Sequence, residues 1–323
     1  MKVIVTCPVK NEEWVLRSTL KNFSTFADLI IIADQSSSDK TLDICKEFSK
    51  VKVIPNPFKG YTNEVRFMLL DEARKEVGEK IIVCLDADEQ IAASFVTEMK
   101  EHILAKKDSK TVSFYSEWLQ IYNNKDTYRV DGLWENNYKT FAFLDDSSLD
   151  YERAYVTQEH IPRVPKTSYT VALKSPIIHL QFLARKRNEV KQALYMCNEL
   201  TEGWDPRRTN NRYSIAKFFQ DTPVKKVSAE FLKDIYYPSE EELSTFDKTK
   251  LDNIYSLFKE KGSGFFEPLD IWHLLELRNY FIEENKREPL AVKVFPKWLI
   301  FINDQKNRIK YRVYLWYTNL NIF

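Results

Sequence analysis

The stretch Ile-Ile-Val-Cys-Leu-Asp-Ala-Asp-Glu at residues 81–89 decides the fold class of this chain. Its apolar run predicts a buried strand, and Asp86 and Asp88 stand where that strand ends. Because side chains alternate along extended backbone, both carboxylates point to the same side. Two carboxylates placed in this way can hold Mg²⁺ or Mn²⁺ against a phosphate. The alternative interpretation is an ordinary strand end with two solvated acids.

The residues before this stretch alternate regularly between two patterns. Apolar runs predict strands, and apolar residues at helical spacing between them predict helices at 12–24, 40–49 and 62–77. The predicted strands are 2–7, 28–33, 51–54 and 80–85. Such alternation predicts an α/β fold with a mostly parallel, Rossmann-like sheet flanked by helices. Ligands of such sheets bind beyond the carboxyl ends of the strands. We therefore expect the polar segments there to face one crevice, and these are 8–13, 34–39, 55–61 and 86–90.

The pattern changes after residue 110 and predicts three regions in all. Residues 1–110 are expected to form one half of a domain, built on the parallel sheet, and 111–182 a mixed-sheet half with long loops, the expected place for an acceptor pocket. The strands expected in the second half are 111–118, 128–130, 139–144 and 175–182. Residues 183–323 are expected to be mostly helical, with helices at 183–203 and over much of 212–286.

Composition narrows the class of protein. The net charge of +1 over 323 residues gives no reason to expect a nucleic-acid partner. The four cysteines form no Cys-x-x-Cys pair, so we expect neither zinc nor disulfides, and we expect Cys7 and Cys84 to be buried. The chain enters a strand at once, without a signal peptide, and has no apolar run near the roughly 20 residues of a membrane span. We therefore expect a cytoplasmic protein.

The tail at 290–323 is basic and aromatic. It has six Lys and Arg residues against Asp304 alone, interleaved with Trp and Tyr. This composition allows two interpretations. The aromatic residues can pack against the helical region, or the tail can make peripheral contact with an anionic membrane.

The familiar glycine-rich phosphate loops are missing from the sequence. No Gly-x-Gly-x-x-Gly follows the first strand, and no Gly-Lys-Ser/Thr occurs. A phosphate would therefore have to be neutralised by a metal ion and by cationic side chains. Asp86 and Asp88 are candidates for the first role, and Lys59 or Arg66 for the second.

Four motifs in this order resemble family-2 glycosyltransferases with the GT-A fold. They are Pro8-Val9-Lys10-Asn11-Glu12-Glu13, Asp34-Gln35-Ser36-Ser37-Ser38-Asp39-Lys40-Thr41, Gly60 with Arg66, and Leu85-Asp86-Ala87-Asp88-Glu89. Each motif alone is weak, but four in register over about 90 residues are specific. Gln35 and Ser36 depart from the family pattern, in which many members carry Asp and Gly, and this loop faces the nucleoside.

The resemblance implies transfer of a sugar, with inversion, from a nucleotide-diphosphate sugar to an acceptor hydroxyl. The expected donor is a UDP- or GDP-sugar, the acceptor a glycan or a lipid-linked molecule, and the cofactor Mn²⁺ or Mg²⁺. By matching position, Pro8, Asn11 and Glu12 would shape the nucleoside pocket, and Asp34 would contact the base or ribose. Asp86 would lie near the ribose and metal, and Asp88 would bind the metal. Arg66 would contact the diphosphate or base, or form an ion pair on its helix.

Inversion in a single displacement needs a base that takes the acceptor proton. Glu159, in Gln158-Glu159-His160-Ile161-Pro162, is the preferred candidate because Pro162 should stiffen its loop. The competing acids are Asp145, Asp146 and Glu152, and His160 is a possible contact to acceptor or diphosphate.

His179 lies in an apolar strand before a basic helix. It is either a hydrogen-bonded core residue or, as the resemblance implies, a further metal ligand. Lys186 and Arg187, which follow, are candidates for the diphosphate or for a solvated helix face.

Two other functions compete with glycosyl transfer. A sugar-nucleotide pyrophosphorylase also has an α/β nucleotide domain with metal carboxylates, but it opens with a glycine-rich loop unlike Pro8-Val9-Lys10-Asn11. A non-catalytic module that binds nucleotide sugars or glycans is the other alternative.

Overall fold

The computed structural model describes residues 1–58, 62, 64–105, 112–130, 134–145, 169–214, 222–290 and 292. These residues fold into two units. The first unit takes its residues from 1–129, 136–183 and 224–244, and the second from the remainder of the chain.

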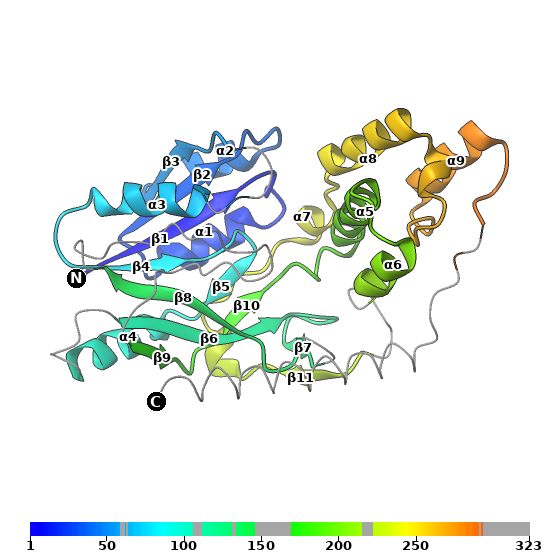
Figure 1. Cartoon of the computed structure of the whole chain (residues 1–323). Helices are drawn as coiled ribbons and strands as arrows, with labels where there is room; N and C mark the ends of the chain where they lie inside the picture. The colour runs from blue at the N-terminus through cyan, green and yellow to red at the C-terminus, as the bar shows by residue number, and fades with distance from the viewer. Residues whose placement is uncertain are drawn as a thin grey trace. The chain divides into compact units, whose positions relative to one another are not determined.

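The first unit begins with a parallel sheet, in which the strands lie in the order β3-β2-β1-β4 (Figure 1). Its strands are β1 (Lys2–Val9), β2 (Leu29–Asp34), β3 (Val51–Pro55) and β4 (Lys80–Cys84). Its helices are α1 (Leu16–Ser24), α2 (Thr41–Lys46) and α3 (Glu64–Arg74). These elements confirm the predicted strands and helices, with ends displaced by a few residues. The parallel sheet therefore places four strand ends at one edge.

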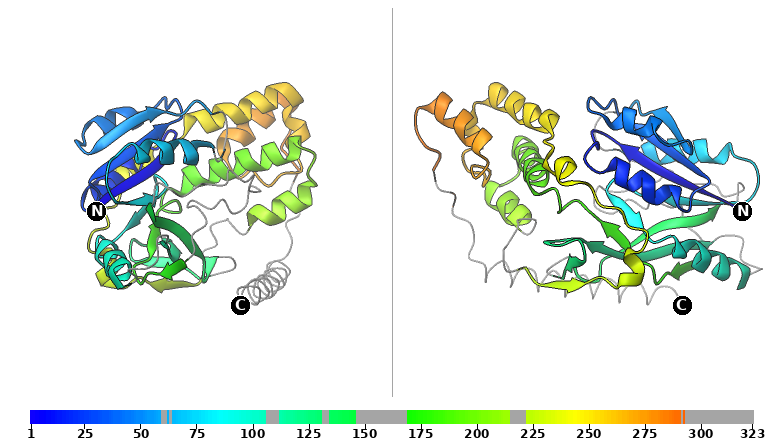
Figure 2. Two further views of the ribbon diagram at one scale, coloured as in Figure 1. Left: turned by 60° about the vertical axis from the view of Figure 1, so that its left-hand side comes forward. Right: turned by 180° about the vertical axis from the view of Figure 1, so that it is seen from behind.

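Helices cover both faces of this parallel sheet. Val65, Leu69 and Ala73 of α3 pack on apolar side chains of β1, β2 and β4. Figure 2 shows α1 on the opposite face, in front of the strands in its right-hand view. The central strands are buried on both sides, so they are almost entirely apolar in sequence.

A mixed extension completes the sheet, which continues from β4 in the order β8-β6-β10-β5, with antiparallel pairings except for the parallel pair of β6 with β10. Its strands are β8 (Tyr138–Asp145), β6 (Val112–Gln120), β10 (Ile177–His179) and β5 (Glu89–Ile91), with β9 (Tyr169–Ala172) pairing β6. The mixed sheet is as predicted, but β5 and α4 (Ser94–Ala105) were not predicted from the sequence.

Four further elements belong to the first unit. β7 (Thr127–Arg129) pairs with β11 (Val224–Lys226), and η2 (Ala229–Leu232) and α7 (Glu240–Ser244) follow. The prediction of mostly helical structure over 212–286 is therefore wrong for residues 222–239, where a strand and a single 3₁₀ turn are the regular elements. The strand forms because residues 224–226 find a partner in β7, which the local sequence does not reveal.

The second unit is a helical cluster with its own apolar core. Its elements are α5 (Arg185–Thr201), α6 (Pro206–Ser214), α8 (Lys248–Lys261), η3 (Ser263–Phe266) and α9 (Leu275–Asn285). Phe258, Phe266 and Phe281 are fully buried in this core. Asp247 caps α8 by accepting a hydrogen bond from the backbone of Lys250. Among the described residues, none of the helices is both long and apolar enough to cross a membrane.

Candidate functional site

The polar strand ends of the first unit meet at one edge of the sheet. Val9, the last residue of β1, pairs with Asp34, the last residue of β2. On the other side of β1, Thr6 pairs with Cys84, where β4 ends. Gln35 follows Asp34 and donates its backbone N–H to the carbonyl of Val9 over 3.0 Å. The described polar residues that follow these strands therefore lie next to one another.

Asn11 and Glu12 tie the loop after β1 to the loop after β2. Asn11 is buried with a φ of 56°, donates its backbone N–H to Ser37 Oγ over 2.9 Å, and accepts at Oδ1 from the backbone of Ser38 over 2.8 Å. The backbone N–H of Glu12 donates to Thr41 Oγ1 over 2.8 Å. Short polar side chains such as Asn tolerate the left-handed conformation that this turn requires. Pro8 precedes the turn and is half-buried.

Asp34 presents one carboxylate oxygen that has no protein partner in the described part of the chain. Its Oδ2 accepts from the backbone N–H of Ser37 over 3.1 Å, whereas its Oδ1 is buried and unpaired there. Buried polar atoms are usually hydrogen-bonded, and leaving one unsatisfied costs about 1–3 kcal/mol. A hydroxyl or N–H group of a ligand would satisfy this oxygen.

Asp86 forms an ion pair with Arg66 of α3. The Arg66 guanidinium donates to Asp86 Oδ1 over 2.6 Å, and the two side chains are 10% and 34% exposed. The backbone N–H of Asp86 donates to the carboxylate of the fully buried Glu89 over 2.9 Å. Burial, with the nearby Asp86 carboxylate adding to it, raises the pKa of the Cys7 thiol well above its usual value. Cys7 and Cys84 are both buried, as predicted.

Asp88 lies beside His179, although His179 comes about 90 residues later in the sequence. The distance from His179 Nε2 to Asp88 Oδ2 is 3.1 Å. The pairing of β10 with β5 brings them together, and Leu180 donates its backbone N–H to the carbonyl of Asp88 over 2.8 Å. His179 is also hydrogen-bonded to Gln120, with 2.6 Å between Nδ1 and Oε1, and stacks on Trp118 with ring centroids 4.5 Å apart.

This pair has the chemistry of a partial metal site. Imidazole nitrogen and carboxylate oxygen are both metal ligands, and atoms 3.1 Å apart can bind the same ion. Across the described residues, no three His, Cys, Asp or Glu side chains are grouped to enclose an ion. Mg²⁺ is usually held by one or two carboxylates together with waters and substrate phosphates. The donor atoms of Asp88 and His179 therefore fit a divalent ion that takes its remaining ligands from elsewhere.

Three of the four candidate bases, Asp146, Glu152 and Glu159, lie outside the described residues, and so does His160, the possible contact to acceptor or diphosphate. Asp145 is described, and its place excludes it from this site. It pairs with Lys80, the first residue of β4, and accepts two hydrogen bonds from Arg74 over 3.1 and 2.9 Å. At about 3.3 Å per residue, the carboxyl end of β4 is roughly 13 Å away. The alternative that Asp145 is the base is therefore wrong. It was compatible with the sequence because the sequence does not reveal the direction of the strand that ends at Asp145.

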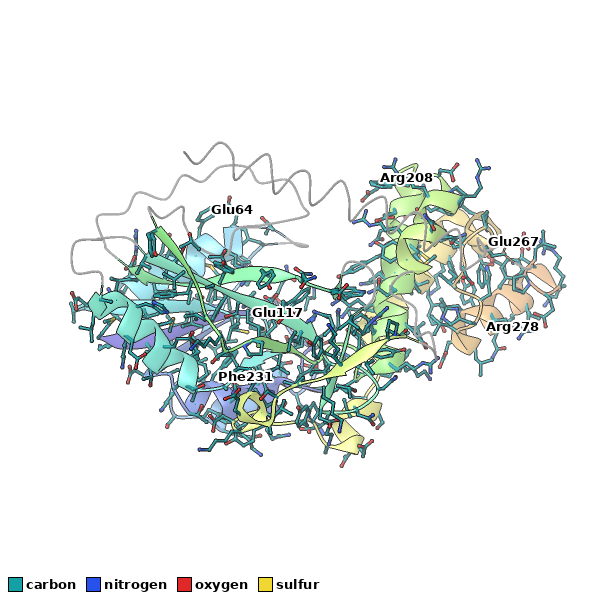
Figure 3. All side chains as sticks on the ribbon, turned by 90° about the horizontal axis from the view of Figure 1, so that it is seen from below. Glu64, Glu117, Arg208, Phe231, Glu267 and Arg278 are labelled. Carbon is teal, nitrogen blue, oxygen red and sulfur yellow. The ribbon has the colours of Figure 1, made fainter. Side chains whose placement is uncertain are left out.

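Glu117 of β6, which is labelled in Figure 3, is another acid close in sequence to Trp118 and Gln120. Burial raises its pKa above the usual value. It does not belong to the site, because alternation along β6 puts it on the face opposite Trp118 and Gln120.

Lys186 and Arg187 form ion pairs within the second unit. Lys186 contacts Glu276 over 2.7 Å, and the buried Arg187 contacts Asp247 over 3.4 Å. The diphosphate role of these two residues stays a prediction.

Sequence reasoning missed Gln120, Trp118 and Glu89. The signal for Trp118 and Gln120 is that side-chain alternation puts both on one face of β6. Gln120 then lies beside His179, because β10 pairs in parallel with β6. Local sequence does not give that pairing. Glu89 was read as part of a polar strand end, whereas β5 buries it completely.

The chain is similar to several known proteins over its first half. Residues 4–160 match the family model described as "Glycosyl transferase family 2". An uncharacterized glycosyltransferase from Rickettsia bellii (strain RML369-C) is 28% identical over 118 residues, which make up 36% of this chain and 38% of that protein. The chain thus spans well under half the length of this curated relative.

Two solved structures overlap with a similar share of the chain. TarS from S. aureus has 19% sequence identity and a TM-score of 0.33, and the overlap covers 39% of this chain and 23% of TarS. Glucosyl-3-phosphoglycerate synthase from Mycobacterium tuberculosis, in complex with Mn²⁺, UDP and glucosyl-3-phosphoglycerate, has 21% identity and a TM-score of 0.29. That overlap covers 36% of this chain and 44% of the synthase.

Proposed function

Residues 4–160 belong to glycosyltransferase family 2, as the sequence motifs indicated, and from this premise we propose that the protein is an inverting, metal-dependent glycosyltransferase. It moves a sugar from a nucleotide-diphosphate sugar, a UDP- or GDP-sugar, to a hydroxyl group of a glycan or lipid-linked acceptor. The single observation that carries this proposal is the Asp88–His179 pair, 3.1 Å apart, at the edge where the strands end.

Each residue of this edge has a proposed task. Asp34, with its buried Oδ1 pointing to no described protein group, accepts a hydrogen bond from the ribose or base. Asp88 and His179 hold Mn²⁺ or Mg²⁺, which supplies charge stabilisation for the departing nucleoside diphosphate. Asp86 lies beside them near the ribose and metal, and its ion pair with Arg66 fixes its carboxylate.

The acceptor must be deprotonated from the face opposite the leaving group. Glu159 is the proposed base, and it lies within residues 4–160, which match the family model. The tail at 290–323 lies outside the described residues except for position 292 and the beginning at 290, so peripheral membrane contact remains a prediction for the lipid-linked case.

The test compares Asp88→Asn and His179→Ala with wild type and with the control Asp43→Asn, an exposed acid on α2. Thermal unfolding with UDP- or GDP-sugars, with and without Mn²⁺, measures metal-dependent donor binding. We expect wild type and the control to be stabilised by about 2.7 kcal/mol at 100 times the dissociation constant, and both site variants to lose the Mn²⁺-dependent part.

Sugar transfer and donor hydrolysis are then measured on the same four proteins. If Asp88→Asn keeps activity within about tenfold, equal to about 1.4 kcal/mol of barrier, the metal assignment is wrong. Mn²⁺-dependent donor binding in wild type, without transfer or hydrolysis, would instead identify a non-catalytic binding module.

A further inference from the structure

Gln120 is fully buried on β6 and contacts His179 directly. Its Oε1 lies 2.6 Å from His179 Nδ1, and the parallel pairing of β6 with β10 places the two residues side by side in register. We infer that Gln120 is a positioning residue that keeps a proton on Nδ1 and so reserves Nε2 of His179 for a divalent cation. The inference rests on the proposed metal-dependent function.

The orientation of the Gln120 amide follows from its second neighbour. The side-chain nitrogen of Gln181 approaches the same Oε1 atom over 3.4 Å. An oxygen at this position accepts from both Gln181 and the imidazole, whereas a nitrogen there would face another amino group. Nδ1 must then carry the proton, because an amide oxygen can only accept. Reversing both amides together would give the opposite tautomer, and the experiment below detects that arrangement.

The proton on Nδ1 determines what Nε2 can do. Nε2 lies 3.1 Å from Oδ2 of the Asp88 carboxylate. With the proton on Nδ1, the lone pair of Nε2 faces this oxygen, and a cation between the two atoms would be bound by both without any movement of the ring. In the opposite tautomer, the only imidazole proton would bond to Asp88 and would have to leave Nε2 before a cation could bind.

Folding alone does not explain a glutamine at this place. The Gln120 side-chain nitrogen is buried without an acceptor among the residues that the structure describes. An apolar side chain would avoid the cost of a buried, unsatisfied polar atom. Trp118 already fixes the plane of the His179 ring by stacking, with an interplanar angle of 24°. What remains for Gln120 is the choice of which nitrogen carries the proton, a role that partners of metal-binding histidines commonly have.

The experiment uses three variants with wild type. Gln120→Glu keeps an acceptor for the Nδ1 proton, and Gln120→Met removes it. Gln90→Met is the matched control, since Gln90 is equally buried on β5 but bonds to the backbone of Tyr236 rather than to His179. ¹⁵N NMR of the metal-free proteins reports the state of each ring nitrogen, and His179→Ala identifies the signal among the four histidines.

We expect a protonated Nδ1 in wild type, Gln120→Glu and Gln90→Met, and loss of this preference in Gln120→Met. The affinity for Mn²⁺ alone, measured by electron paramagnetic resonance, should fall 10- to 100-fold in Gln120→Met and stay within about threefold in the other two variants. Neither the wild-type spectrum nor its assignment depends on Gln120→Met, so the inference stays testable even if that variant does not fold.

The possible failures are distinguishable. A wild-type His179 with a bare Nδ1, together with a Mn²⁺ site that His179→Ala removes, overturns the role of Gln120 and leaves the proposed function standing. Gln120→Met with unchanged spectrum and Mn²⁺ affinity does the same. If wild type shows the expected Nδ1 proton but binds no Mn²⁺ through His179, the metal-dependent function fails, and the cation role of Nε2 fails with it.

Discussion

The ion pair between Arg66 and Asp86 should couple α3 to the end of β4 strongly enough to measure. The guanidinium is only 10% exposed, the carboxylate is 34% exposed, and the atoms are 2.6 Å apart. Hydrogen bonds between charged groups contribute about 1.5–3 kcal/mol, and solvent screening at the more exposed carboxylate reduces this. We therefore expect a coupling free energy of about 1–2 kcal/mol. The single change Asp86→Asn should cost more than this coupling, because it leaves the buried guanidinium with less compensation.

A double-mutant cycle with Arg66→Met, Asp86→Asn and the double variant measures this coupling from the free energies of unfolding in urea. The control cycle removes the pair between Lys46 and Asp43, which has a similar distance of 2.8 Å but side chains that are 75% exposed. We expect no coupling above experimental error in the control. If the Arg66–Asp86 cycle gives no more than the control, the pair is only a surface contact, and the reasoning from burial is wrong.

Three further predictions concern donor binding, catalysis and acid stability. Asp34→Ala should raise the donor KM more than it lowers kcat, because the proposed contact of Asp34 is to the nucleoside alone, and a pure kcat defect would refute this placement. Glu159→Gln should slow transfer by roughly 10²–10⁴ with donor binding nearly unchanged, and normal transfer by this variant would show that the base lies elsewhere. In the second unit, the Arg287 guanidinium lowers the pKa of Glu267 (Figure 3) from 4.5 to about 2. A carboxylate whose pKa is lower in the folded than in the unfolded protein stabilises the fold at pH values above its unfolded pKa. The difference in stability between wild type and Arg287→Gln should therefore shrink as the pH falls from 4.5 towards 2. A difference that stays constant over this range in urea titrations would show that the pair does not form.

The parallel half of the sheet was predictable because each strand is buried on both faces. Such strands are short, continuous apolar runs, and the helices between them show the apolar spacing of one covered face. β4, for example, is buried at every position, and the predicted run at 80–85 differs from it by one residue. The four strand ends follow from this order, so the placement of Asp34, Asp86 and Asp88 at one edge required no three-dimensional information.

The mixed half of the sheet was less predictable because distant segments determine it. Glu89 and Gln90 are polar, and nothing local indicates that β5 buries both of them. Gln90 is satisfied by the backbone of Tyr236, 146 residues later, which donates its N–H over 2.8 Å and accepts over 2.7 Å. A polar residue whose partners lie so far away looks like a loop residue in a local pattern. The helix α4, by contrast, buries Phe95 and Met99, which are four residues apart. This helical spacing in the sequence was a signal for α4, although the helix was not predicted.

The same long-range dependence explains why the residues around the proposed metal site were the hardest to predict. Asp88 is fixed by its place after β4, but His179 reaches it only through β10, which is three residues long. So short a strand has little stability of its own, and its position depends on β6 on one side and β5 on the other. Gln120 enters the site through that same pairing, 59 residues before His179. The residues with the weakest local signal are therefore those whose chemistry depends most on the assembled sheet, and a variant that disturbs the pairing of β6 with β10 should affect them together.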